Sequence, residues 1–155
     1  MAQRSDPIES YGADPIGGFN FYVEVDGAGD IRARFTEVSG LKGEVEEFEI
    51  KEGGLNTRTH KLPGRVTWGP ITLKKGLGDE TFFNEWFDKV VNNTSGQVRK
   101  NIKILLLDRE METVRTWDIA NAWPKSWEAP NLNSGSSELA LETLVLNHEG
   151  VTESK

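Results

Sequence analysis

Cysteine is absent from the 155-residue sequence, and this absence removes several classes of protein at once. Without thiols the chain has no disulfide framework, no cysteine-ligated zinc ribbon and no thiol nucleophile. Packing and association are therefore the remaining sources of stability. Long hydrophobic runs are missing too. The longest uninterrupted aliphatic run covers residues 104–107, which is far too short to cross a bilayer.

The first residues and the charge balance add two further expectations. Residues 1–10 contain no apolar stretch of the kind that a secretory signal needs, so we expect no signal peptide, no membrane span, and synthesis and assembly in the cytoplasm. Basic residues are in the minority, with 18 Lys and Arg against 25 Asp and Glu and a net charge of −7. Because nucleic-acid binding needs a local basic cluster, and Arg99 with Lys100 is the nearest approach to one, we expect no specific nucleic-acid binding.

Candidate catalytic and metal-ligating residues are few. His60 and His148 lie far apart in the sequence, and neither has a second ligand at a metal-binding spacing. Asp26 and Asp30 flank glycines, but the alternating carboxylates and the terminal glutamate of a calcium loop are missing, which favours a hairpin turn. We therefore predict no catalytic, cofactor-binding or metal site, no cofactor, and no enzyme activity.

The dominant period of the sequence is two, which is typical of β-strands. Apolar residues alternate with polar ones over residues 19–25, a glycine-rich turn follows at residues 26–30, and a second alternation covers residues 31–35. This pattern predicts a β-hairpin with one buried face.

The same reasoning predicts further strands, at residues 45–50, 65–73, 102–107, 114–119 and 138–147. The alternation slips at Glu46 and Glu47, which indicates a β-bulge. Pro124 and Pro130 predict a loop between the last two of these strands. The total is roughly seven or eight strands.

Only one segment has a helical period. Large apolar side chains recur at three- and four-residue spacing after Asp79, a candidate N-cap, and before the polar stretch of residues 92–96. The predicted apolar face of this helix consists of Phe82, Phe83, Trp86, Phe87, Val90 and Val91. We interpret it as the surface by which a helix covers one end of a β core, and an aromatic ligand pocket is the alternative.

Tryptophan and acidic residues suggest a function of a different class, a carbohydrate-binding β-sandwich module. Trp86 belongs to the predicted helix face, and Trp68 and Trp117 belong to predicted strands. Trp123 and Trp127 fall in the predicted loop, where packing over the edge of the core is favoured over stacking on a sugar.

A series of short phrases resembles, in the same order, the tail-tube (inner tube) protein family of contractile phages and phage-like contractile injection systems. The phrases occupy residues 19–27, 35–41 (FTEVSGL), 52–54, 61–64 (KLPG), 71–76, 121–124 (NAWP) and 142–150. Each phrase alone is weak evidence, but their shared order over most of the chain makes coincidence improbable.

This resemblance implies a mainly β (α+β) fold, in which two packed antiparallel β-sheets form a barrel-like sandwich with one flanking α-helix and a long extended hairpin. It implies a single tube-protein β domain at residues 19–151, an N-terminal extension at residues 1–18 and a C-terminal tail at residues 152–155. The hairpin would cover roughly residues 44–66. Its ring-stacking residues, by resemblance, are Glu52, Gly53, Gly54, Leu55, Asn56, Thr57, Arg58, Thr59, His60, Lys61, Leu62, Pro63 and Gly64.

The resemblance also implies a function. The chain would be a structural subunit of an inner tube, built of stacked homo-hexameric rings around a lumen that carries cargo or genome, and sheath contraction would drive this tube into a target. Implied partners are further copies of the chain and the sheath, baseplate or spike, and tube-terminator proteins of a phage tail or extracellular phage-like particle. A baseplate-proximal tube-initiator ring and a tube protein like that of type VI secretion are alternatives within the family.

Overall fold

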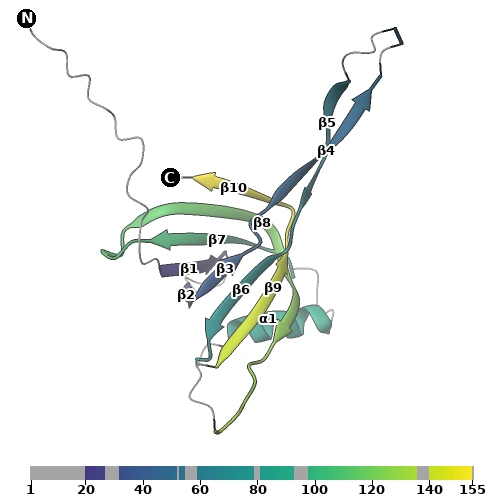
Figure 1. Cartoon of the computed structure of the whole chain (residues 1–155). Helices are drawn as coiled ribbons and strands as arrows, with labels where there is room; N and C mark the ends of the chain where they lie inside the picture. The colour runs from purple at the N-terminus through teal and green to yellow at the C-terminus, as the bar shows by residue number, and fades with distance from the viewer. Residues whose placement is uncertain are drawn as a thin grey trace, which may run out of the picture.

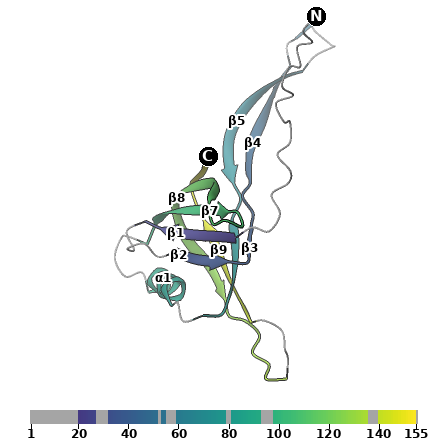
Figure 2. The same cartoon turned by 90° about the vertical axis from the view of Figure 1, so that its left-hand side faces the viewer.

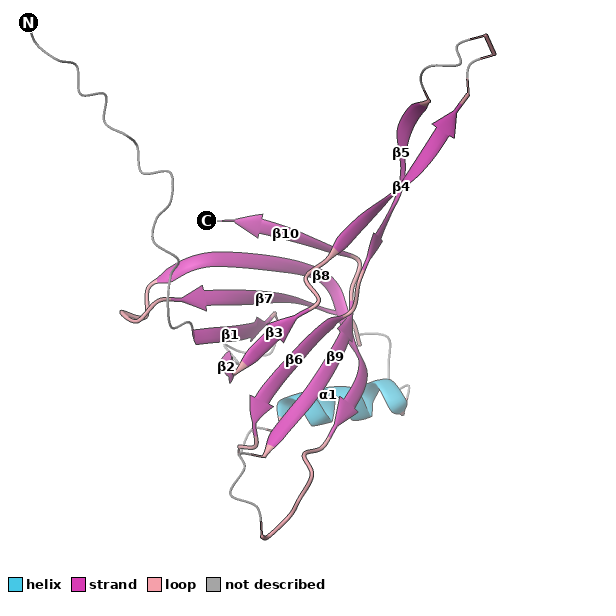
Figure 3. Cartoon of the chain, in the orientation of Figure 1, coloured by secondary structure: helices cyan, strands magenta, loops and turns pink. Residues whose placement is uncertain are grey.

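The computed structural model describes residues 20–26, 32–51, 53–54, 59–78, 81–92, 98–135 and 140–154. Within these residues the chain forms ten strands and one helix. The helix is the cyan element of Figure 3, and strands make up the rest of the regular structure. The predicted fold class, mainly β with one flanking helix, is confirmed.

One sheet of eight strands forms the body of the protein. These strands are β1 (Asn20–Val25), β2 (Arg32–Phe35), β3 (Glu37–Ser39), β6 (Ile71–Gly76), β7 (Lys100–Leu107), β8 (Thr113–Glu128), β9 (Leu141–Asn147) and β10 (Gly150–Ser154). Their order is β2-β1-β7-β8-β9-β6-β3, with β10 paired to β8. The predicted first hairpin is confirmed, because β1 and β2 pair antiparallel. β7, apolar on both sides, lies between β1 and β8, as its sequence predicts for a central strand.

Two segments bend this sheet into a sandwich-like body. Thr36 alone separates β2, which pairs with β1, from β3, which pairs with β6. On the other side of the body, the first part of β8 pairs with β7 and its last part pairs with β9. Figure 1 shows β8 curving from one layer into the other. The apolar faces of both layers meet in one core, which includes Val23, Ile104 and Leu146.

The predicted loop at Pro124 is wrong, because β8 continues through this residue to Glu128. Asn121 has a φ of 49° and turns the chain just before the proline. The register then shifts between Pro124 and Ser126. Proline has no amide donor and is tolerated in a sheet at such irregular positions, so the strand survives.

The C-terminal strand β10 was not predicted. Residues 152–154, which the sequence analysis leaves in a tail, lie in β10 and pair with β8. The domain bounds at residues 19 and 151 and the extension at residues 1–18 stay predictions, because residues 1–19 lie outside the described part of the chain.

Helix α1 (Phe82–Val91) packs against the body through two buried aromatic side chains. Phe83 meets Phe35 edge to face, with the ring centroids 5.4 Å apart. Trp86 is 1% exposed, and its indole N–H donates to the Val98 carbonyl at 2.7 Å. The helix thus covers one end of the core.

The other residues of the predicted helix face are less covered. Phe82, Phe87 and Val90 are half-buried, and Val91, the last residue of the helix, is 62% exposed and lies outside the buried face. The N-cap is Thr81, whose hydroxyl donates to the Glu85 carboxylate at 2.9 Å, and not the expected Asp79, which lies outside the described residues.

Two charged side chains are buried where β6 and β9 pair. Lys75 is 4% exposed and Glu142 is 7% exposed, and their Nζ and Oε2 atoms are 3.6 Å apart. The Trp127 indole N–H donates to Glu142, and the Lys75 ammonium lies 5.1 Å from the centroid of the Phe83 ring. Each buried charge is thus compensated, Glu142 by Lys75 and the Trp127 indole, and Lys75 by Glu142 and the Phe83 ring. Loss of one member would leave a buried charge without its partner.

Replacing Trp86 by alanine should lower the free energy of unfolding by about 3–5 kcal/mol, because it opens a large cavity and leaves the Val98 carbonyl without its donor. Urea unfolding of the dispersed protomer measures this change. Val91→Ala is the matched control on the same helix, and its effect should stay within about 0.5 kcal/mol. Equal effects of the two substitutions would contradict the burial described above.

Replacing Glu142 by leucine should destabilise the protein by about 3–5 kcal/mol, because the buried Lys75 ammonium loses its counter-charge. The double variant Lys75→Met with Glu142→Leu should be less destabilised than the Glu142→Leu single variant. A double-mutant cycle from denaturant unfolding measures the difference. A double variant that is less stable than the single one would show that the pair is not coupled as its geometry indicates.

Candidate functional site

A two-stranded hairpin stands apart from the body. Strand β4 (Gly43–Ile50) pairs with β5 (His60–Trp68), and the two form a sheet of their own. Figure 1 and the turned view of Figure 2 both show this hairpin projecting well beyond the body. The register shifts between Val45 and Glu47, which confirms the predicted bulge. The predicted long hairpin is therefore present, and its strands pack chiefly on each other.

The described residues among those predicted for ring stacking lie in the part of the hairpin that is distant from the body. Gly53 and Gly54 lie in a turn, Thr59 precedes β5, and residues 60–64 form the first half of β5. Glu52 and residues 55–58 lie outside the described residues. The role of the whole set in ring stacking stays a prediction.

The register divides the hairpin into an apolar face and a charged face. Directly opposed residues of an antiparallel pair project to the same side, and successive residues alternate between sides. The apolar face consists of three cross-strand pairs, Val45 with Val66, Phe48 with Leu62, and Ile50 with His60. The charged face carries Glu44, Glu47, Glu49, Lys61 and Arg65.

The apolar face is uncovered in the protomer. Its five hydrophobic side chains have exposed fractions of 47% (Val45), 57% (Phe48), 47% (Ile50), 48% (Leu62) and 52% (Val66). They are half of the ten large hydrophobic side chains that are exposed in the described part of the chain. A contiguous exposed apolar surface of this kind marks an interaction site.

Two glycines allow aromatic rings to lie flat on this face. A Cβ atom on Gly64 would sit 2.4 Å from a ring carbon of Phe48, and a Cβ atom on Gly43 would sit 2.7 Å from a ring carbon of Trp68. Each ring thus covers the backbone of the opposite strand where a side chain is missing. The final glycine of the KLPG phrase therefore has a packing role that shapes the apolar face.

The resemblance to tail-tube proteins indicates residues 52–64, and it does not reveal that Val45, Phe48 and Val66 belong to one surface. On β4 the bulge interrupts the alternation, so Val45 has an odd number and Phe48 and Ile50 have even numbers although all three lie on the same face. The signal was present on β5, where Leu62, Gly64, Val66 and Trp68 alternate with polar residues at period two. Only the register shows that both strands share this face.

Lys61 and Glu47 form an ion pair on the charged face. The Lys61 Nζ lies 3.0 Å from Glu47 Oε2, and this hydrogen bond and charge, with a smaller contribution from Glu49, raise the pKa of Lys61. Both side chains are more than half exposed, so water and salt screen the pair and it adds little to stability. We interpret this face as the solvated side of the hairpin.

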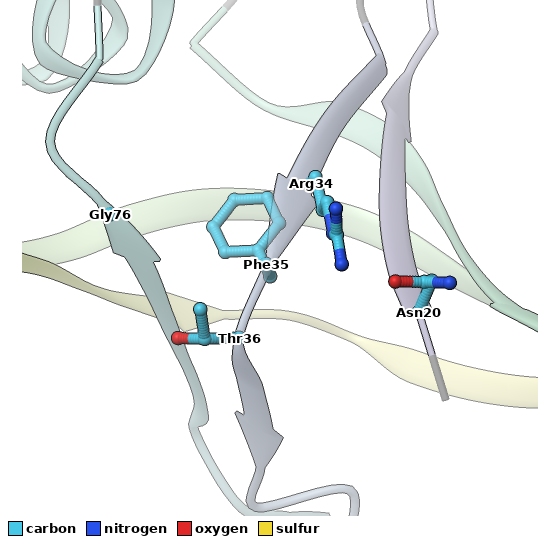
Figure 4. A pocket seen from close by; sticks show the side chains of 5 residues that line it. All are labelled: Asn20, Arg34, Phe35, Thr36 and Gly76. Atoms are coloured by element: carbon cyan, nitrogen blue, oxygen red, sulfur yellow. The ribbon is translucent and has the colours of Figure 1, made fainter. Parts of the chain in front are cut away.

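The body offers little that could support catalysis. A shallow pocket of about 450 Å³ lies beside β1 and β2 (Figure 4), lined by Asn20, Arg34, Phe35, Thr36 and Gly76. Among the described residues of this lining Arg34 is the single charged one, and the Thr36 hydroxyl is engaged with the Lys74 carbonyl at 3.0 Å. These described residues therefore provide no paired acid and base.

The described residues offer neither a metal site nor a membrane-spanning helix. No three of their His, Asp and Glu side chains lie close enough together to hold a metal ion. The one helix among them is too short and too polar to cross a membrane.

The tryptophans serve packing, which weakens the sugar-binding alternative. The indole N–H groups of Trp86 and Trp127 are both engaged within the protein, and Trp68 covers Gly43. Trp117 and Trp123 are half-buried in β8, where the predicted loop does not exist. Stacking on a sugar needs an open aromatic face, and these rings are already in contact with the protein.

Comparison with solved structures gives matches over nearly the whole chain. A chain of the anti-feeding prophage (AFP) baseplate has a TM-score of 0.77 and 26% identity, covering 92% of this chain and 97% of that one. A chain of the AFP tube-terminating cap has a TM-score of 0.76 and 29% identity, covering 99% of both chains. A chain of the PVC sheath-tube complex, an extracellular contractile injection system in its extended state, has a TM-score of 0.74 and 26% identity, also covering 99% of both.

More distant matches concern the fold alone. A type six secretion system protein has a TM-score of 0.59 at 12% identity, covering 88% of this chain and 83% of that one. Among curated proteins, none matches the sequence significantly.

The family comparison covers both the body and the hairpin. The family model described as T4-like virus tail tube protein gp19 matches residues 17–152, which is most of the sequence. The chain therefore belongs to the family of T4-like virus tail tube proteins.

Proposed function

We propose that this chain assembles with copies of itself into hexameric rings that stack into the inner tube of a contractile injection particle or phage tail. In this proposal the apolar face of the hairpin docks on a neighbouring copy, and residues 52–64 take part in ring stacking. The observation that carries the proposal is the exposed apolar face on an element that the body does not cover.

The energetics of the hairpin support a partner. An isolated two-stranded hairpin is marginally stable in water, and a third strand or a packed face is usually needed to hold it. Burying the apolar face would contribute about 25 cal/mol for each Å² removed from water. The hairpin of one copy and the surface that receives it differ, so the contact is heterologous and can repeat from copy to copy.

The body also presents strand edges that favour association. Among the described residues, β10 pairs with β8 alone and β3 pairs with β6 alone. Free edges of this kind are templates for further pairing, and neighbouring copies in a ring would close them.

The proposed partners follow from membership of the tail tube family. They are the sheath, baseplate or spike, and tube-terminator proteins, with cargo or genome in the lumen. The role is structural and not enzymatic, with assembly in the cytoplasm before the tube works in a phage tail or extracellular particle. The similarity to a baseplate chain makes a baseplate-proximal tube-initiator ring the second candidate.

Charging the apolar face should abolish assembly and leave the body folded. In the double variant Phe48→Glu with Leu62→Glu, each substitution removes about 1.5–3 kcal/mol of apolar burial at the interface. The onset concentration for assembly should therefore rise more than about 100-fold. Negative-stain electron microscopy and light scattering over a range of protein concentrations measure the onset, and circular dichroism measures the fold.

Glu49→Gln on the opposite face is the matched control and should assemble like the unmodified chain. Hollow tubes formed by the doubly charged variant at the usual concentration would rule out docking through the apolar face. An unmodified chain that stays monomeric at every concentration would count against self-assembly without a baseplate template.

A further inference from the structure

We propose that His148 is a positioning residue that fixes the direction in which the hairpin leaves the body. Together with Trp68 it would lock the root of the hairpin against the turn between β9 and β10. The inference rests on the proposed function, since the direction of the hairpin matters for assembly only if the hairpin docks on another copy.

The hairpin joins the body through a break in the strand ladder. β3 and β6 pair as far as Ser39 and Thr72, and the pairing of β4 with β5 begins at Gly43 and Trp68. Between these two pairings, residues 40–42 lead out to the hairpin and residues 69–70 lead back from it. These two connecting segments, here called the crossings, are joined by one backbone hydrogen bond, from the Gly69 amide to the Lys42 carbonyl at 2.9 Å. Strand pairing does not continue through this joint, so the hairpin can twist there relative to the body unless a third contact holds it.

The joint itself is tightly packed. Gly40 has a φ of 85°, and a Cβ atom there would sit 2.2 Å from the Pro70 carbonyl oxygen. This close approach requires glycine and holds the two crossings together.

His148 adds a contact between this joint and the turn that joins β9 to β10. Its Nε2 lies 2.8 Å from the Gly69 carbonyl oxygen, and its ring packs against the Trp68 ring with the centroids 6.0 Å apart. His148 follows β9 directly and precedes β10 by one residue, and both strands pair within the main sheet. The contact therefore joins the body to both the backbone and the side chain of the hairpin root.

A side chain that replaces His148 must donate a hydrogen bond to the Gly69 carbonyl oxygen. A carbonyl oxygen accepts, so Nε2 of His148 carries the hydrogen and donates it. Nδ1 is enclosed and has no hydrogen-bond partner among the described residues. The side-chain amide of glutamine can place a donor near the position of Nε2, whereas alanine removes both the donor and the ring.

The length of the hairpin amplifies small changes at its root. The eight residues of β4 span roughly 26 Å at about 3.3 Å per residue. A rotation of about 20° at the joint would therefore move the far end by roughly 9 Å, nearly twice the spacing between paired strands. If only a fraction of protomers hold the docking direction, the apparent affinity falls by that fraction.

Because the chain has no cysteine, two introduced cysteines can be spin-labelled without background. Glu49→Cys on the charged face and Lys89→Cys on α1 place exposed labels on the hairpin and on the body. Pulsed electron paramagnetic resonance of the dispersed protomer then measures the distribution of distances between them. We expect a narrow distance distribution when His148 is present. The distribution should be at least about twofold wider in His148→Ala, and it should be narrow again in His148→Gln.

His60→Ala is the matched control, since it removes the other histidine, which lies on the hairpin away from the root, and it should leave the width unchanged. If His148→Ala does not fold, His148→Asn replaces it, because its shorter amide does not reach the Gly69 carbonyl. An unchanged width in these loss variants, or a glutamine variant as wide as the alanine variant, would overturn the proposal.

The same variants test the consequence for assembly. His148→Ala should raise the onset concentration at least about tenfold, and His148→Gln should restore it. An onset that does not move while the distances broaden would show that the direction of the hairpin is not limiting for docking, and would overturn the assembly role of His148. If the unmodified chain fails to assemble but the widths change as expected, the proposed function fails and the assignment of the joint stands.

Discussion

A single turn, formed by His148 and Glu149, contacts both the bend of β8 and the root of the hairpin. The Glu149 carboxylate accepts a hydrogen bond from the Asn121 side-chain amide at 2.7 Å, and the Glu149 amide donates to the Ala120 carbonyl at 3.0 Å. These contacts hold Asn121 at its positive φ, where β8 passes from one layer to the other. One residue earlier, His148 contacts Gly69 at the hairpin root. The bend of the body and the joint of the hairpin therefore depend on the same turn.

Two groups of apolar side chains are separate from each other in the described part of the chain. One is buried in the body beneath α1 and stabilises the protomer. The other lies on one face of the hairpin and contributes little to that core, because β4 and β5 pack chiefly on each other. Confining exposed apolar area to one face, with charged side chains on the other, limits association to one side of the hairpin. The stability of the protomer and its ability to associate are therefore governed by different residues.

Local patterns account for the parts of the fold that the sequence predicts well. The alternation through Phe21 and Val23 and the helical period through Phe83 and Trp86 each reflect burial on one side of a single element. The bulge beside Glu47 is also local, because it interrupts an alternation that is otherwise regular. The hairpin between β4 and β5 could be predicted in extent from its resemblance to tail-tube proteins, and its faces could not, since they depend on a register that the bulge changes.

The parts that were not predictable depend on contacts between distant segments. Pro124 reads as a breaker of strands, and β8 passes through it because Asn121 turns the chain first, with Glu149 holding that turn. Strand β10 is short and mostly polar, so its own residues show no alternation that would predict a strand. It is recognised as a strand by its pairing with β8. His148 lies in the family phrase of residues 142–150, but that phrase does not reveal its contact with Gly69, which spans 79 positions of the sequence.

A projecting element held in one direction has an advantage over a flexible one. Docking a flexible segment requires that its conformational freedom be lost on binding, whereas a segment already oriented loses little. The hairpin root shows the means of such orientation, since glycine allows the crossings to approach closely and a histidine of the body binds one of them. An apolar face presented at a fixed angle can engage each successive copy in the same way. Regular repetition in the proposed tube would then follow from the geometry of one joint, and the area of the apolar face would set only how tightly the copies hold.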